Sequence, residues 1–470
     1  MLRLRSLAVT ASALALAACA TGPDYVAPHP PVAASGPFLS TAPALTTPAP
    51  VEGNWWQLYR DPMLDKLIAD ALAANTDIRV AVANLAKARA GLREVRTDRL
   101  PQVGVGASGQ YGRASQLQRA PGSPRESWTV DAGLDVSYEV DLFGRVSRGV
   151  EAARGDVDAA QADTDAVRVA VVADTARAYA DAVSSGERLA VAQRIVDLLD
   201  QSLKVTTRRV EVGMTTRLDS ARIGALRNQR AADVPAIAAE RQAALFRLAT
   251  LTGRTPQQLP AEIAERVTTL RLDQPIPVGD GAALLARRPD VRAAERRLAS
   301  STARIGVATA DLYPHISLGA SIGSTGTGVS DLFGGGPLRW LLGPLISWSF
   351  TDHERARARV AGAEADSQAA LARFDGTMLK ALEETETALS NYAHALDRRT
   401  ALQAACDQAG IAAKITRAQQ REGQIDSLAA LDAERTLAET QAALALQDAQ
   451  IADAQVDLFR ALGGGWQNRV

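Results

Sequence analysis

The chain has 470 residues, and its 52 lysine and arginine residues nearly balance its 53 aspartate and glutamate residues, which gives a formal net charge of −1. A nucleic-acid partner is not indicated, because phosphate binding requires a clear excess of positive charge. With only two cysteines, the chain cannot depend on a disulfide framework. Its length would suit two or three ordinary domains.

The first 18 residues have the pattern of a bacterial export signal, in which two arginines precede an apolar run. The sequence Leu-Ala-Ala-Cys at residues 16–19 resembles a lipobox, whose cysteine is acylated on sulfur and becomes the mature N-terminus. We therefore expect residues 1–18 to be removed and Cys19 to carry a covalent lipid, with no other cofactor. Ala20 stands where aspartate would favour inner-membrane retention, so the outer membrane is expected. The alternative is an ordinary signal peptide with an incidental cysteine.

The mature chain contains a duplicated unit. After an extended lipid-anchored segment at 19–62, a first repeat at 63–253 and a second at 281–463 flank a linker at 254–280, and a tail follows at 464–470. Each repeat is predicted to contain a helix, two strands, a long helix, a turn and a further helix. The matching pairs are Asp77 with Asp290, Pro101 with Pro314, Gly213 with Gly423 and Gly253 with Gly463.

Two stretches in each repeat alternate apolar and polar residues, which is the pattern of a strand with two different faces. The predicted strands lie near 102–113, 127–142, 315–323 and 338–351. In the second of these, Trp128 and Tyr138 lie toward the ends of the apolar face. Aromatic residues in such positions are typical of lipid-facing barrel strands. The opposite face carries Asp131, Asp135 and Glu139, which we expect to line the lumen and to favour cations.

Four strands are too few to close a membrane barrel, because eight is the smallest bacterial number and an open edge in lipid leaves backbone groups unsatisfied. Three copies would supply twelve strands. The expected fold is therefore mainly α with a membrane β-barrel: four strands per protomer form a 12-stranded trimeric barrel, continuous with a wall of long helices. The alternative is a soluble four-stranded sheet beside a coiled coil.

The wall of helices is suggested by two very long proline-free stretches, at about 152–212 and 355–422. At 1.5 Å per residue, each would form a helix roughly 90 Å long. A helix of this length needs neighbours along its whole length. Leucine or isoleucine every seven residues supplies a coiled-coil seam. The clearest such series is Leu437, Leu444, Ile451 and Leu458.

Three segments resemble hallmarks of the outer-membrane efflux lipoproteins of the TolC and NodT type. They are Cys-Ala-Thr-Gly-Pro-Asp-Tyr at 19–25, Trp-Trp-Gln-Leu-Tyr-Arg-Asp-Pro at 55–62 and Tyr-Glu-Val-Asp-Leu-Phe-Gly-Arg at 138–145. With the duplication, the resemblance covers essentially the whole mature chain. It implies a homotrimer whose 12-stranded outer-membrane barrel is continuous with a long periplasmic α-helical barrel. It further implies docking to a periplasmic adaptor (membrane fusion) protein, which couples the trimer to an inner-membrane pump of the RND type. It also implies a passive outer-membrane exit duct for drugs and other small molecules, and not an enzyme.

The same resemblance implies that the helix hairpin tips dock the adaptor and close the periplasmic aperture. Glycine followed by serine or threonine is a helix stop and restart signal, and it occurs at both tips. The tip residues are Gly213, Thr215, Gly423 and Ser427.

The family pattern Leu-x-x-x-Asp-Ala-x-Arg is matched at Leu428, Asp432 and Arg435, which are therefore aperture candidates. The first tip differs, because Arg222 occupies the position equivalent to Asp432 and Asp219 lies nearby. We expect Arg222 or Arg435 to pair with a carboxylate across the closed tip. The alternative is that these are solvated helix-end charges.

The sequence contains no phosphate loop, nucleophile elbow or zinc motif, and its four histidines have no ligand spacing, so no metal site and no catalysis are expected. The main alternative function is a structural periplasmic coiled-coil lipoprotein. Ducts for metal efflux or protein secretion would share the expected fold, although four methionines give little support to a copper or silver route.

Overall fold

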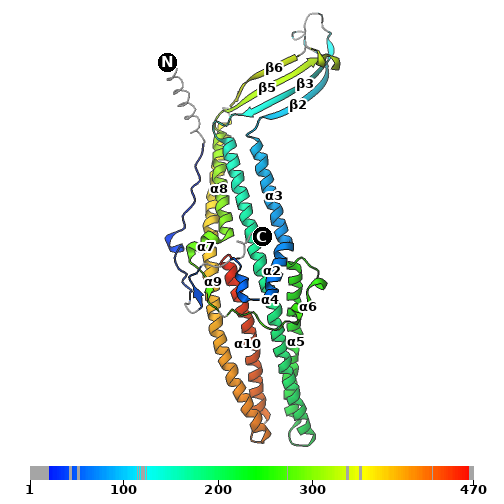
Figure 1. Cartoon of the computed structure of the whole chain (residues 1–470), viewed down its shortest axis with the longest axis vertical. Coiled ribbons are helices and arrows are strands. Elements are labelled where there is room, and N and C mark those ends of the chain that lie inside the picture. Colours follow the sequence, from blue (N-terminus) through cyan, green and yellow to red (C-terminus); the bar gives the residue numbers. More distant parts are fainter. Residues whose placement is uncertain are drawn as a thin grey trace. The chain divides into compact units, whose positions relative to one another are not determined.

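The computed structural model describes residues 21–41, 45–49, 53–113, 115, 117, 122, 124–272, 274–334, 338–348, 352–425 and 427–464 (Figure 1). The predicted leader, Cys19 and nearly all of the predicted tail lie outside these residues. The chain divides into two compact units. The sheet unit contains the chain up to Pro28 with Asn84–Gln161 and Ala293–Asp375, and the hairpin unit contains His29–Ala83, Ala162–Arg292 and Gly376–Val470.

The secondary structure repeats along the chain. The first repeat contains α3 (Thr76–Thr97), β2 (Gln102–Arg113), β3 (Glu126–Glu139), α4 (Arg145–Glu211) and α5 (Arg217–Leu251), and the second contains α8 (Pro289–Ala310), β5 (His315–Gly326), β6 (Leu338–Ser347), α9 (His353–Arg421) and α10 (Ser427–Ala461). Matching helices have nearly equal lengths: 22 residues in α3 and α8, 35 in α5 and α10, and 67 and 69 in α4 and α9.

Shorter elements complete the chain. They are the helices α2 (Pro62–Ala74), α6 (Ala261–Glu265) and α7 (Gly281–Arg287), the 3-10 turns η1 (Val32–Ala34), η2 (Trp55–Tyr59), η3 (Pro256–Gln258) and η4 (Val329–Phe333), and a two-stranded parallel sheet of β1 (Thr46–Thr47) and β4 (Ile276–Pro277). Within the described residues, no helix combines the length and the low polarity that a membrane crossing would require.

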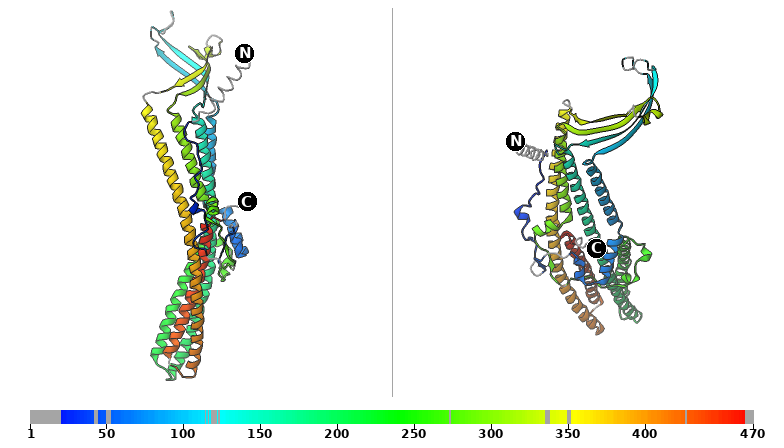
Figure 2. Two further views of the ribbon diagram at one scale, coloured as in Figure 1. Left: turned by 90° about the vertical axis from the view of Figure 1, so that its left-hand side faces the viewer. Right: turned by 45° about the horizontal axis from the view of Figure 1, so that its top comes forward.

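The sheet unit contains one curved antiparallel sheet in the order β2-β3-β5-β6 (Figure 2). Its register places Asp131 opposite Ser108 on β2 and Thr325 on β5, while Tyr111 lies opposite Trp128. Residues paired in this way share a face of the sheet, because side chains alternate along each strand. One face is therefore apolar, and the other is polar and rich in glycine on β2, β3 and β5, with Leu341 and Leu345 of β6 on the same side. Among the described strands, β2 and β6 each have a neighbour on one side only.

The apolar face of this sheet is exposed to an unusual degree. Its side chains include Val105, Trp340, Leu342 and Ile346, whose exposed fractions are 85%, 73%, 70% and 69%. A contiguous apolar surface of this kind marks contact with lipid or with another protein. In this sheet the exposed face agrees with the alternation in the sequence.

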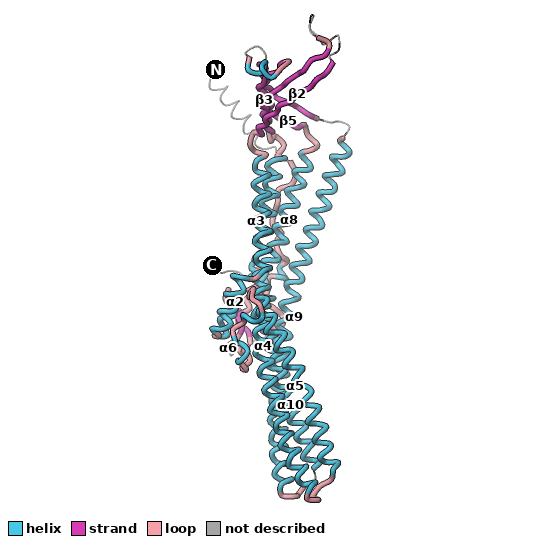
Figure 3. Tube along the Cα trace, turned by 90° about the vertical axis from the view of Figure 1, so that its right-hand side faces the viewer, coloured by secondary structure: helices cyan, strands magenta, loops and turns pink. Residues whose placement is uncertain are grey.

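The hairpin unit has two helical hairpins and a conventional core. The turn between α4 and α5 and the turn between α9 and α10 lie at the same end of this unit (Figure 3). Trp55 is fully buried and stacks on Phe459 of α10, with 4.6 Å between the ring centres. Aromatic stacking of this type adds to the free energy gained by burial. The tryptophan pair at 55–56 therefore belongs to the core of this unit.

Asp61, in the same sequence motif, joins three parts of the hairpin unit. Its carboxylate accepts hydrogen bonds from the backbone N–H groups of Met63 and Leu64 and so caps α2. It also accepts a 2.9 Å hydrogen bond from the Tyr179 hydroxyl and one of equal length from Arg266. Since the carboxylate is only 2% exposed, its charge is stabilised by these donors.

A matched pair of contacts shows the duplication at atomic detail. In the first repeat, the Asn75 amide donates to the carbonyl of Leu251 at 3.0 Å, and in the second, Arg288 donates to the carbonyl of Ala461 at 2.9 Å. Each contact joins the start of one helix to the last turn of another. Gly253 follows the first such turn with a φ of +66°, and a Cβ there would lie 2.9 Å from the carbonyl oxygen of Ala74, so glycine is required.

We predict that Asp61→Ala lowers the stability of the hairpin unit by about 2–4 kcal/mol, because it removes a helix cap and leaves the buried Tyr179 hydroxyl without its acceptor. Thermal unfolding in detergent measures the change. The control is Asp280→Ala, since Asp280 is exposed and its side chain caps α7 alone, at 2.8 Å from the Ala283 nitrogen. The control should cost only about 1 kcal/mol. Equal losses in the two variants would contradict the role given to Asp61.

Candidate functional site

The polar face of the sheet carries an ion pair that spans three strands. Arg339 on β6 donates to both carboxylate oxygens of Asp131 on β3, at 2.8 and 2.6 Å. Thr325 on β5 lies between them, because its hydroxyl donates to Asp131 at 2.6 Å and accepts from the Arg339 Nε at 3.0 Å. Asp131 therefore shares the predicted face with Asp135 and Glu139, but its charge is compensated.

Glu139, at the end of β3, is also paired. Arg145, in the first turn of α4, donates from Nε to Glu139 Oε1 at 2.7 Å and makes a second hydrogen bond from Nη2 to Oε2. This two-point contact is the strongest geometry for an arginine and a carboxylate. His315 lies 4.0 Å from the same carboxylate. The sequence indicated the face of Glu139 but gave no sign of this partner.

The segment that follows the predicted lipid anchor is held in a socket on the sheet unit. Thr21 donates from its backbone nitrogen and its hydroxyl to the carbonyl of Phe143, at 3.1 and 2.8 Å. Gly22 packs directly on Gly306 of α8, where a Cβ at Gly22 would lie 2.5 Å from the Gly306 Cα. The segment thus contacts both repeats. At the contact with the second repeat, both residues are glycines, so backbone packs directly on backbone.

Charged and aromatic side chains complete this socket. Arg148 of α4 is 7% exposed and donates to Asp24 at 2.5 Å and to the Thr21 carbonyl at 3.4 Å. The Tyr25 hydroxyl hydrogen-bonds Glu295 of α8, and burial together with this carboxylate raises the pKa of Tyr25. Two motifs that are far apart in the sequence, at 19–25 and 138–145, therefore meet.

We predict that Gly306→Val displaces the N-terminal segment, because a Cβ at Gly306 would lie 2.8 Å from both the Thr21 oxygen and the Arg148 Cγ. Hydrogen exchange followed by mass spectrometry should show residues 21–25 exchanging at least about tenfold faster. The control is Gly362→Val, since Gly362 is also helical but a Cβ there meets no atom within 4 Å. Unchanged protection in Gly306→Val would show that the socket does not hold the segment.

The hairpin tips have the geometry that their glycines predicted. Gly213 and Gly423 adopt φ values of +74° and +71°, and a Cβ at either would meet no atom within 4 Å. Leu428 is 49% exposed, and Asp432 is exposed as well. Of Ser427 the structure describes only the backbone, at the start of α10. The tip surface therefore leaves an apolar and an acidic side chain open to solvent on α10.

Asp219 has a local role at the first tip. Its carboxylate accepts hydrogen bonds from the hydroxyls of Thr215 and Thr216, at 2.6 and 2.8 Å, and from the Thr216 backbone nitrogen at 3.2 Å. The Thr215 hydroxyl contributes most to lowering the pKa of Asp219. This arrangement is a capping box that starts α5. Asp219 therefore stabilises the tip structure itself.

The arginines expected to pair across the tip have other surroundings within one protomer. Arg435 lies 3.0 Å from Glu439 on its own helix, and the charge of Arg222 is among the causes that lower the pKa of Asp219 on the same helix. Glu439 also accepts from Arg230 of α5 at 3.0 Å, which joins the two hairpins. Glu439 was not predicted, because nothing in its local sequence distinguishes it from a solvated helix charge.

Each hairpin also has an internal ion pair. Arg227 on α5 donates to Asp200 on α4 at 2.9 and 3.2 Å, and Arg417 on α9 makes two hydrogen bonds with Glu434 on α10. Pairs of this kind hold the two helices of a hairpin in register near the tip. Any movement of one helix past the other must break them.

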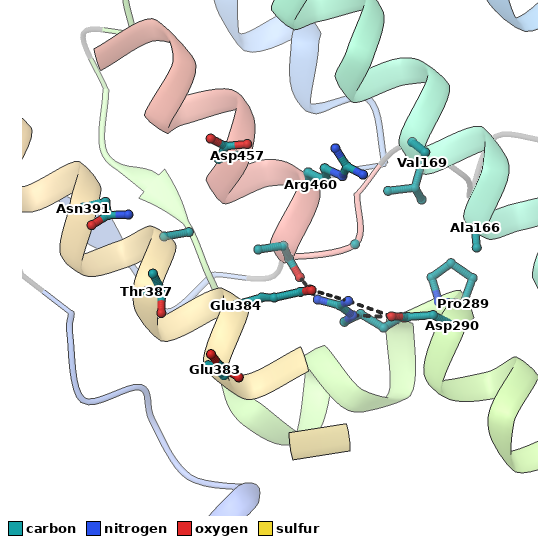
Figure 4. Close-up of a pocket in the computed structure, with 15 residues that line it drawn as sticks. Ala166, Val169, Pro289, Asp290, Glu383, Glu384, Thr387, Asn391, Asp457 and Arg460 are labelled. Carbon is teal, nitrogen blue, oxygen red and sulfur yellow. Dashed lines mark hydrogen bonds and ion pairs between the residues drawn. The ribbon is translucent and has the colours of Figure 1, made fainter. Parts of the chain in front are cut away.

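A cavity of about 560 Å³ lies in the hairpin unit, between the ends of α8 and α10 and the sides of α4 and α9 (Figure 4). At its wall, the buried Arg288 is hydrogen-bonded to Asp290 at 2.6 Å and to Glu384 at 2.7 Å. Asp457 is paired with Arg177, and Arg460 lies 3.5 Å from Asp174. Asp457 and Arg460 are thus compensated one to one, whereas Arg288 faces two carboxylates, so the cavity wall is on balance acidic.

Asp181 on α4 and Asp453 on α10 form a carboxylate pair in the same unit. Burial, followed by the negative charge of Asp181, raises the pKa of Asp453 to about 7. Burial also raises the pKa of Asp181, where Arg177 and Arg247 act in the opposite direction and Glu240 in the same one. Two carboxyl groups this close favour sharing one proton.

We predict that Asp453→Asn stabilises the hairpin unit at alkaline pH. A raised folded-state pKa favours the protonated form, so the wild type loses stability as pH rises from about 4 through 7, and asparagine mimics the protonated group. In thermal unfolding, the melting temperature of the variant should exceed that of the wild type at pH 8.5, by roughly 2–4 °C for each kcal/mol of stability, and should equal it only below about pH 4. The control is Asp457→Asn, which breaks the Arg177 ion pair and should destabilise the protein. A pH-independent difference in Asp453→Asn would contradict this account.

The fold described above is similar to those of solved outer-membrane proteins. The solved outer-membrane channel OprN superimposes with a TM-score of 0.90 over 96% of this chain and 100% of that one, at 36% identity. The outer membrane protein VceC of Vibrio cholerae has a TM-score of 0.81 and 26% identity, over 89% of this chain and 100% of that one. The fold is therefore that of an outer-membrane channel. The predicted fold class, mainly α with a membrane β-barrel, is confirmed.

The family model described as outer membrane efflux protein matches residues 67–254 and 282–464, so the chain belongs to that family. Outer membrane protein OprJ of Pseudomonas aeruginosa is 32% identical over 97% of this chain and 94% of its own length. Nodulation protein T of Rhizobium leguminosarum bv. trifolii is 29% identical over 96% of each chain. The protein is thus the outer-membrane channel component of a tripartite efflux system, as the sequence predicted.

Proposed function

We propose that three copies of the chain form a passive duct, anchored by a lipid on Cys19, with no catalytic activity of its own. The observation that carries this proposal is the sheet, which combines a highly exposed apolar face with one unpaired edge on each of β2 and β6. In lipid each unpaired backbone group costs several kcal/mol, so the edges must pair. Joining β6 of one copy to β2 of the next satisfies them and gives twelve strands from three copies.

The partners proposed for this duct are a periplasmic adaptor, which docks at the hairpin tips, and an inner-membrane pump of the RND type. The glycines Gly213 and Gly423 support a docking role, because they leave the backbone of both tips accessible. Thr215 and Ser427 belong to the same proposed surface. The remaining proposed contact is with outer-membrane lipid, through the apolar face of the sheet.

The exported molecules are proposed to be small organic compounds. The names of similar proteins include a toluene efflux pump outer membrane protein of Pseudomonas putida and an antibiotic efflux pump outer membrane protein of the same species. A third is a pyoverdine export outer membrane protein. These compounds share little chemistry, which suits a wide duct whose selectivity resides in the pump.

The periplasmic aperture is proposed to lie at the tips, where Leu428, Asp432, Arg435 and Arg222 remain the candidate residues. Asp432 is the strongest of them, because it is exposed and makes no close ion pair among the described residues, although the charge of Arg435 acts on it from a distance. Three copies of an unpaired carboxylate close to a common axis would narrow and charge the opening.

We predict that Asp432→Ala raises the conductance of the trimer in planar lipid bilayers at least about tenfold, because it removes a charge and shortens a side chain at the narrowest point. Asp366→Ala is the control, since Asp366 is also an exposed carboxylate, on α9 and far from the tip in sequence. A large wild-type conductance that Asp432→Ala leaves unchanged would remove Asp432 from the aperture. No conductance in any variant would reject the duct in favour of a structural lipoprotein.

A further inference from the structure

The three acidic residues of β3 lie on one face but do not have equal environments. Asp131, Asp135 and Glu139 are four residues apart, so alternation places all of them on the polar face of the sheet. The compensation of each charge depends on which cation the neighbouring strands and helices place beside it.

Asp131 is neutralised from two strands away. Arg339 lies on β6 opposite Gly323 of β5, which in turn lies opposite Gly133 of β3. A Cβ at Gly323 would lie 2.8 Å from the backbone oxygen of Ala132, so this position must be glycine. No side chain therefore blocks the path of Arg339 over β5 to Asp131, where it forms the two hydrogen bonds described above.

Glu139 is neutralised by Arg145 through the two-point contact at the start of α4. Asp135, between the two paired acids, lies opposite Gly104 of β2 and Ser321 of β5. It is exposed and makes no hydrogen bond or close ion pair with the part of the chain that the structure describes, although the charge of Arg339 acts on it from a distance. Of the three acids, Asp135 is thus the one whose charge has no direct partner.

We propose, resting on the duct proposed above, that Asp135 determines the ionic preference of the membrane section of the channel. Three copies would form a ring of unpaired carboxylates on the lumen wall, and the rings at Asp131 and Glu139 would be close to neutral. Arg339 therefore compensates the charge of Asp131 and reduces its effect on passing ions. The range of such a wall charge is set by screening, at roughly 10 Å in 0.1 M salt and 30 Å in 0.01 M salt.

Because Asp131 is paired with Arg339, substitutions of the acids and of the arginine should shift the cation preference in opposite directions. Asp135→Asn removes the unpaired charge and should cut the cation preference at least about twofold. Asp131→Asn leaves Arg339 unpaired and should also shift the preference toward anions. Arg339→Gln unmasks Asp131 and should increase the preference for cations, which a merely structural role of the arginine would not do.

The measurement is the reversal potential of the purified trimer in planar bilayers under a KCl gradient of about 0.01 to 0.1 M, where screening is weak. Each variant is made both in the wild type and in Asp432→Ala, and the background with the higher conductance is used. The reversal potential then reports the ion preference of the barrel rather than that of a narrow periplasmic end. The control is Glu126→Gln, because Glu126 pairs with Arg113 in register and lies on the opposite face. Heat-resistant trimers on gels show that each variant has assembled.

The proposal is supported if Asp135→Asn and Arg339→Gln shift the reversal potential in opposite directions and Glu126→Gln does not shift it. Conducting trimers whose reversal potential is unaffected by Asp135→Asn would overturn this inference alone. An equal shift in Glu126→Gln would also overturn it, because the faces would then be wrongly assigned. Absence of conductance in every variant would overturn the duct itself, and this inference with it.

Discussion

The hydrogen-bonding demand of the backbone at the two edges of the sheet is the constraint on which the architecture depends. Strands β2 and β6 each present unpaired N–H and C=O groups, and the face between them is apolar and exposed. Water could satisfy these groups, but lipid cannot. A sheet of this composition is therefore incomplete as a single copy.

The duplication shows how the two halves have diverged around a common frame. Asn75 and Arg288 occupy equivalent places and bind equivalent carbonyl groups, of Leu251 and Ala461. The arginine is long enough to bind Glu384 of α9 as well, at 2.7 Å, so the second half is tied to one further helix. The tips have diverged in the same manner, since Arg222 stands where the other half has Asp432. Helix lengths have been retained, and charges have changed.

Charge pairing separates residues that hold the structure from residues that are available to ions. Asp219 caps a helix, and Asp131 and Glu139 are bound by arginines. Asp432 and Asp135 make no such hydrogen bonds with the described residues, and the charges of Arg435 and Arg339 act on them only from a distance. An exposed ion pair contributes at most about 1 kcal/mol to stability, yet it removes most of the field that a passing ion would experience. The pairing is therefore more important for conduction than for folding.

The sequence by itself determined the features that depend on local periodicity. Alternation of apolar and polar residues predicted the four strands and their faces, and the absence of proline together with seven-residue spacing predicted the long helices. Comparison of the two halves of the sequence was enough to reveal the duplication, and the glycines at 213 and 423 marked the turns. Each of these features is set by residues within a few positions of one another, which is why pattern alone was sufficient.

Only the tertiary structure decided which charges meet. Arg339 and Asp131 are 208 positions apart, and Thr21 and Gly306 are 285 apart. Their contacts depend on strand register, on glycines that let backbones approach, and on the docking of one repeat against the other. No local pattern contains this information, since an arginine on a strand looks the same with or without a partner. For this reason the sequence could predict the acidic face of β3 but could not predict that Asp135 alone remains unpaired there.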